Sequence, residues 1–132
     1  MSRSTLYGTA LVLGHALVAT VHGLAHQHLA IALTAGQKLF ILLVITLAPL
    51  VSMVLLWTRL RKMGAALLLL SMLGSLIFGV VNHFVIISPD HVQHLSTGDW
   101  RFAFQITAVL LVVTECLGCW IGAKILRAKA SV

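Results

Sequence analysis

Four runs of apolar residues, separated by three short polar links, make up nearly the whole chain. The runs cover residues 6–26, 39–57, 63–87 and 102–126. Each reaches the roughly 20 residues that a helix needs to cross the hydrocarbon core of a bilayer. The links, 27–38, 58–62 and 88–101, are too short for a further folded unit. We therefore predict an all-α fold: a single domain over residues 1–132, built as an integral membrane four-helix bundle.

The composition agrees with this pattern and excludes a soluble domain. Hydrophobic residues make up 60% of the chain and charged residues 9%, against roughly 25% charged residues in soluble domains. The net charge of +6 does not indicate nucleic acid, because nucleic-acid binders gather basic residues on one face or arm. Here the basic residues lie at the ends of the apolar runs, so the expected partner is the lipid bilayer.

The distribution of Lys and Arg predicts the orientation, because cytoplasmic loops retain positive charge. With the N-terminus inside, only Lys38 and Arg101 fall on the outer side. The inner side holds seven basic residues: Arg3, Arg59, Arg61, Lys62, Lys124, Arg127 and Lys129. Both termini are therefore expected to be cytoplasmic, in a multi-pass protein of a bacterial inner (plasma) membrane.

Small residues recur at helical spacing on the last two spans. Ser71, Ser75 and Gly79 follow one another every four residues, and Gly118 and Gly122 form a G-x-x-x-G pair. Within lipid, small side chains let helix backbones approach closely. These positions are expected to be helix contacts.

Histidines within the first span are the main functional clue, because ionisable groups inside a bilayer are costly and usually face the protein interior. His22 and His26 each lie within about 20° of His15 around the helix axis, on opposite sides of it. We expect this stripe to face the neighbouring helices.

The other spans add polar groups at two depths. The third span carries Asn82 and His83 near its outer end, and the fourth carries Glu115 in its middle. A rise of about 1.5 Å per residue places His83 near the outer surface, level with His22 and His26. The same estimate puts His15 and Glu115 deeper, about 17–21 Å down. We expect these two to form a pair that relieves the cost of burying either one.

The outer link between the third and fourth spans resembles a helix start. In Ser88-Pro89-Asp90-His91, Ser would be the N-cap, Pro would take the first helical position, and Asp would favour the dipole. A short helix would place His91 and His94 on one face. We therefore predict a short outer-loop helix that lowers these histidines and Asp90 over the outer end of the bundle.

The histidines predict a metal site. Neutral imidazole is the commonest metal ligand and suits copper, zinc and iron. His22 and His26 have the i, i+4 spacing with which one helix face binds one ion. His83, His91 and His94 are candidates to complete it, with His15, Glu115, Asn82 and Asp90 as a second tier. Position 23 is Gly, so the zinc-protease motif is not present.

Other uses of these histidines stay open. Two helices that each present one imidazole are typical of haem ligation, and single histidines also hold pigments. We interpret the chain as a protein that binds a transition metal or haem at an extracytoplasmic histidine cluster, for metal handling or electron transfer. The alternatives are an accessory subunit of a larger respiratory or photosynthetic complex, with pigment, quinone or partner contacts, and an oligomeric proton or metal-ion transporter. No arrangement for nucleophilic catalysis is evident, and whether the protein is an enzyme stays open.

Overall fold

The computed structural model describes residues 3–128, which form helices joined by turns. The first span is α1 (Arg3–His28). The second consists of three consecutive segments: α2 (Ala35–Phe40), the π-helix η1 (Ile41–Leu47) and α3 (Ala48–Leu56). The third is α4 (Arg61–Val80) with the π-helix η2 (Val81–Val85), and the fourth is α5 (Arg101–Arg127). All four spans are long and apolar enough to cross a membrane, so the predicted number and positions of the helices are confirmed.

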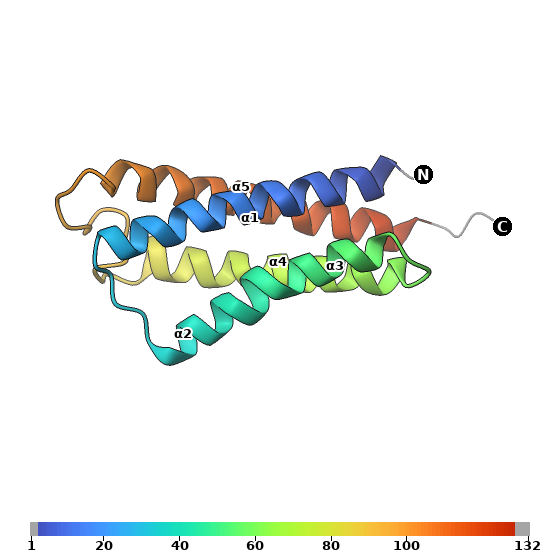
Figure 1. Ribbon diagram of the computed structural model, residues 1–132, viewed down its shortest axis with the longest axis horizontal. Helices are drawn as coiled ribbons and strands as arrows, with labels where there is room; N and C mark the ends of the chain where they lie inside the picture. The colour runs from blue at the N-terminus through green and yellow to red at the C-terminus, as the bar shows by residue number, and fades with distance from the viewer. Residues whose placement is uncertain (1–2, 129–132) are drawn as a thin grey trace.

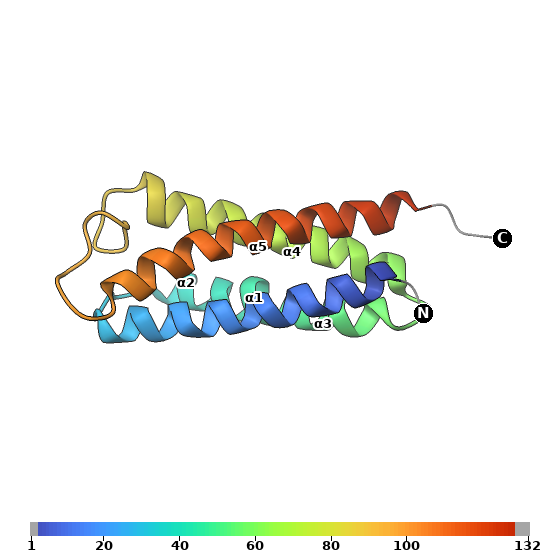
Figure 2. The same cartoon turned by 90° about the horizontal axis from the view of Figure 1, so that it is seen from above.

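The four spans run alternately up and down in an elongated bundle. Figures 1 and 2 show that the start of α1 and the end of α5 lie at the same end, beside the connection from α3 to α4. We call this the terminal end. The opposite end, called the loop end, carries the connections 29–34 and 86–100. The predicted even number of crossings therefore matches the observed arrangement.

The second span begins at Ala35, before the predicted position 39, because a capping box fixes its start. The Thr34 Oγ1 atom accepts a hydrogen bond from the Gln37 amide at 3.2 Å, and Gln37 Oε1 accepts one from the Thr34 amide at 2.9 Å. This reciprocal arrangement satisfies two backbone donors that a helix start otherwise leaves free.

The second span departs from a regular α-helix just before Pro49. The Ala48 amide donates to the carbonyl of Leu43, five residues back, at the end of η1. Proline lacks an amide hydrogen and its ring crowds the preceding turn, so a wider turn accommodates it. Figure 1 shows α2 swinging away from α1 at the loop end.

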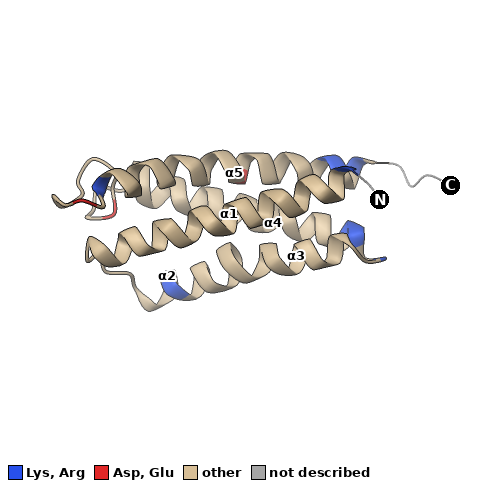
Figure 3. Ribbon diagram, turned by 45° about the horizontal axis from the view of Figure 1, so that its top comes forward, with Lys and Arg blue, Asp and Glu red and all other residues tan. Residues whose placement is uncertain are grey.

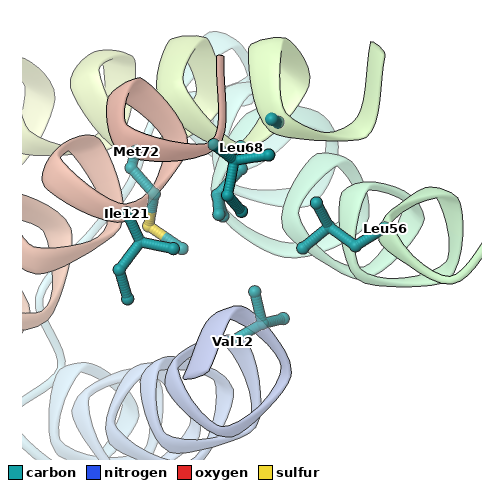
Figure 4. Packing of buried hydrophobic residues seen from close by; sticks show 7 residues of the cluster. Val12, Leu56, Leu68, Met72 and Ile121 are labelled. Carbon is teal, nitrogen blue, oxygen red and sulfur yellow. The ribbon is translucent and has the colours of Figure 1, made fainter. Parts of the chain in front are cut away.

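The terminal end is filled by close apolar packing. Figure 4 shows side chains from four helix segments converging there: Val12, Leu56, Leu68, Met72 and Ile121. A Cβ built on Gly118 would lie 2.5 Å from Met72 Cγ, and one on Gly122 would lie 2.9 Å from the Ala65 carbonyl oxygen. The predicted small-residue contact of the fourth span is therefore confirmed as an interface between α5 and α4.

The predicted short helix in the outer loop is wrong. Between Val85 and Arg101 the chain forms only turns and bends. The Ser88 hydroxyl does accept a hydrogen bond from the Asp90 amide at 3.2 Å, but the Val92 amide donates to the His83 carbonyl at 3.0 Å. This bond ties the loop back onto the end of η2, and the turns it closes replace the helix.

Charge and apolar surface are distributed as a membrane protein requires. Figure 3 shows most Lys and Arg positions at the terminal end, and the Asp positions in the connection at the loop end. Large apolar side chains stay exposed along the spans, such as Leu17 at 68% and Leu70 at 66%. Lys129, which is expected on the inner side, lies outside the described residues. The cytoplasmic location of the termini stays a prediction.

Candidate metal centre

The histidine stripe of α1 faces the bundle interior. His15, His22 and His26 are all buried, as the helical spacing predicts. His28, two residues further on, is exposed and stacks on the Trp100 ring with centroids 4.4 Å apart and nearly parallel planes. The stripe therefore ends at His26, and His28 belongs to the surface.

Three histidines from two spans meet at the loop end. His22 and His26 come from α1, and His83 comes from η2. One ring nitrogen from each lies within 4.8 Å of the other two. The His22 ring lies 5.0 Å from that of His26 and 4.9 Å from that of His83, centroid to centroid. These three buried histidines lie close enough to bind one metal ion.

The hydrogen bonds around His22 fix which of its nitrogens carries the proton. His22 Nδ1 lies 2.8 Å from Thr107 Oγ1. The Thr107 hydroxyl has one proton and donates it to the Ala103 carbonyl, 2.6 Å away in the same helix. The hydroxyl oxygen must then accept a hydrogen bond from His22 Nδ1. His22 Nε2 therefore carries the lone pair.

His83 is oriented in the same way by the loop. Its Nδ1 lies 3.2 Å from the backbone carbonyl of Asp90 and 3.1 Å from Asp90 Oδ1. A carbonyl only accepts hydrogen bonds, so Nδ1 is the donor and Nε2 carries the lone pair. His22 Nε2 and His83 Nε2 face each other at 3.3 Å. Two lone pairs at this distance repel each other unless a proton or a metal ion lies between them.

The distance between these nitrogens suits a tetrahedral metal ion. Zinc binds imidazole nitrogen at about 2.0–2.1 Å, and two such ligands at a tetrahedral angle lie about 3.3 Å apart. The observed separation is 3.3 Å. The His26 ring is the third member. Its Nε2 lies 3.3 Å from Asp90 Oδ1, and within residues 3–128 its buried Nδ1 has no hydrogen-bond partner.

Two residues of the site were not predicted. Thr107 holds His22, and the Phe104 ring packs against all three histidines at 4.5, 5.0 and 5.3 Å between centroids. The helical spacing of the sequence does contain a signal for Thr107. This residue lies two turns before Glu115, on the helix face that continues to Gly118 and Gly122. Phe104 carries no comparable signal, since an aromatic residue is common on any buried face.

The remaining predicted site residues lie outside the cluster. The His91 and His94 rings lie 5.0 Å from each other, and neither belongs to the group of converging nitrogens within the described chain. Asn82 accepts a hydrogen bond from Gln37 Nε2 at 3.2 Å, so it links the third span to α2. His15 Nε2 lies 3.5 Å from Glu115 Oε1 in the interior, as the depth estimate predicts.

A cavity of about 810 Å³ extends from the histidines into the middle of the bundle. Its walls come from all four spans and are largely apolar. At the loop end it is lined by His22, His26, His83 and Asp90, and deeper by His15, Ser75 and Glu115. The histidine cluster therefore borders an accessible space instead of being closed by protein on every side.

Comparisons with protein-family models, with curated proteins and with solved structures find no match to this chain. We therefore infer the function from the site itself.

Proposed function

We propose that this protein is a multi-pass membrane protein that binds a transition-metal ion through His22, His26 and His83. The single observation that carries the proposal is the pair of opposed Nε2 atoms 3.3 Å apart, each turned toward the other by a hydrogen bond on the far side of its ring. Zinc or copper fits best, because imidazole is a preferred ligand of both ions.

The surroundings of the three rings support a metal ion. Metal-binding histidines almost always donate their second nitrogen to a carboxylate, carbonyl or similar acceptor, which fixes the tautomer and strengthens the ligand. Asp90 supplies such an acceptor to His83 and Thr107 supplies one to His22. Packing alone does not explain why the Nδ1 atoms of His22 and His83 are both hydrogen-bonded while their Nε2 atoms face each other.

The geometry gives the haem alternative no support. Two axial imidazoles bind opposite faces of the iron, so a porphyrin plane must separate their rings. The His22 and His83 nitrogens lie 3.3 Å apart, and the Phe104 ring packs edge-on against His83. A compact ion requires no such separation of the rings.

The number of ligands favours metal handling over a purely structural role. Closed structural zinc sites usually have four protein ligands, whereas sites that exchange a ligand keep one position open. Here three histidines converge beside a cavity. With the termini cytoplasmic, the site lies on the extracytoplasmic side of a bacterial inner membrane. A homo-oligomer, or a place in a larger membrane complex, stays a prediction.

Metal titration of the purified protein tests the proposal. Metal-free protein is titrated with Zn²⁺, and bound zinc is measured by elemental analysis. We expect about one ion per chain. In His83→Ala the affinity should fall at least about 100-fold, more than the loss of an outer-shell partner costs.

His28→Ala is the matched control, because it removes a histidine of the same helix that stacks on Trp100 outside the cluster. It should bind zinc like the wild type. Equal zinc uptake by the wild type and His83→Ala would refute the site.

A further inference from the structure

The deep part of the cavity has a polar floor that the metal centre does not use. His15 of α1, Ser75 of α4 and Glu115 of α5 line it, and their exposed fractions are 1%, 0% and 2%. The floor lies about 10 Å from the metal centre, since seven residues of α1 separate His15 from His22. It is therefore a separate feature of the same cavity.

Three buried polar atoms on this floor lack a hydrogen-bond partner within residues 3–128: His15 Nε2, Ser75 Oγ and Glu115 Oε2. His15 Nε2 lies 3.5 Å from Glu115 Oε1. A buried polar group without a partner is costly, and native proteins rarely keep several together. These atoms are placed to bind the polar head of a ligand.

The entrance to the cavity faces the side of the bundle. Thr20 of α1 and Thr46 of η1 both line the cavity and are exposed. Thr46 lies near the middle of its span and Thr20 about two turns from the loop end of α1, on the two helices that diverge in Figure 1. A molecule dissolved in the bilayer can enter here without crossing the aqueous phase. The volume of about 810 Å³ falls within the roughly 300–1,000 Å³ of small-molecule sites.

The floor selects the charge of the head group. Glu115 and His15 carry no net charge between them when they share one proton, whichever residue holds it. A charged head group on this floor would then have no opposite charge beside it, because Lys38 and Asp90 line the cavity nearer the loop end, and such burial is strongly unfavourable. A neutral head with carbonyl or hydroxyl oxygens pairs with the Ser75 hydroxyl and the acid–imidazole pair at no such cost.

We propose that the cavity binds a neutral, lipid-soluble molecule whose head carries carbonyl or hydroxyl oxygens, such as a quinone, with that head on His15, Ser75 and Glu115. The apolar tail lies along the wall formed by Ala16, Ala19 and Ile45 and leaves toward the lipid. This inference does not depend on the metal centre.

Binding of decylubiquinone to the protein in lipid nanodiscs tests the proposal, with protein-free nanodiscs as the background. We expect saturable binding of about one molecule per chain. Ala19→Phe places a bulky ring in the cavity and should abolish it. Ala10→Phe makes the same substitution on the same helix, at an exposed position outside the cavity, and should leave binding unchanged. Equal binding by the wild type and Ala19→Phe would overturn the proposal.

Two further measurements examine the floor. Ser75→Ala removes one hydroxyl with little change in volume and should weaken decylubiquinone binding about 10-fold. Dodecanoate and dodecylamine test the requirement for a neutral head, and tighter binding of either one would overturn it. Ala19→Phe and Ser75→Ala should both retain one zinc per chain, so that failure of the cavity proposal is distinguished from failure of the metal centre.

Discussion

At the terminal end of the bundle the helices meet through apolar side chains and small residues, whereas at the loop end they enclose histidines, a carboxylate and a cavity. Gly118 and Gly122 bring α5 against α4 at the terminal end. At the other end Pro49 and the π-helical turn before it let α2 diverge from α1. The same four helices are thus packed tightly at one end and opened at the other.

This difference also bears on the alternative of an ion path. A path would have to continue from Glu115 to the terminal end. There Leu68, Met72 and Val12 are fully buried and fill the space between the helices. The polar residues His15, Ser75 and Glu115 line the cavity on the loop-end side of this packing.

The largest expected effect comes from disrupting the helix packing at the terminal end. Gly122→Val should lower the free energy of unfolding by about 2–3 kcal/mol, because its Cβ would lie 2.9 Å from the Ala65 carbonyl oxygen and 3.0 Å from the Leu69 amide nitrogen. Neither backbone atom can move without shifting α4. Denaturant titration in mixed micelles measures the change.

Gly14→Val is the matched control, since a Cβ at Gly14 of α1 meets nothing within 4 Å. Both substitutions put a β-branched residue in place of a helical glycine, so the difference between them isolates the contact with α4. Equal stability of the two variants would contradict the close approach of these helices.

A smaller effect, on zinc affinity, is expected from Asp90→Asn at the loop end. The Asp90 carboxylate lies 3.1 Å from His83 Nδ1 and 3.3 Å from His26 Nε2. Its loss should weaken zinc binding about 10–100-fold, as measured by competition with a chelator. Asp99→Asn changes an exposed carboxylate of the same loop and should bind like the wild type. An unchanged affinity in Asp90→Asn would show that the loop does not orient the ligands.

Much of the fold and part of the site follow from local patterns. The four apolar runs identify the spans because each is long enough by itself, and the spacing of His15, His22 and His26 places them on one face. The meeting of His15 with Glu115 follows from depth alone. These properties depend on one helix at a time, or on position along the bundle axis.

What the sequence could not supply depends on contacts between distant segments. The Ser88-Pro89-Asp90 pattern is a valid local helix signal, yet the bond from the Val92 amide to the His83 carbonyl holds this segment in turns. The same fold of the loop brings Asp90 to the cluster and leaves His91 and His94 beside each other. The cavity likewise depends on the angle of α2, which no pattern of residues in α2 encodes.

The smallest expected effect concerns the hydroxyl that sets the tautomer of His22. Thr107→Val keeps the shape of the side chain but removes the acceptor that lies 2.8 Å from His22 Nδ1. The Nδ1 proton is then buried without a partner, so the tautomer of His22 with the proton on Nε2 becomes more stable. In that tautomer Nε2 has no free lone pair and cannot bind metal. We expect zinc affinity to fall about 10-fold. Thr107→Ser retains the hydroxyl and should restore binding.

Thr114→Val controls for the loss of a threonine on the same helix. The Thr114 hydroxyl donates to the Leu110 carbonyl at 2.9 Å, as Thr107 does to Ala103, but it contacts no histidine within the described residues. Zinc affinity should be unchanged in this variant. If Thr107→Val and Thr114→Val weaken binding equally, the hydroxyl acts through helix stability. If only Thr107→Val weakens binding and Thr107→Ser restores it, zinc binding at the loop end depends on the His22 Nδ1 proton, which the Thr107 hydroxyl of α5 holds in place.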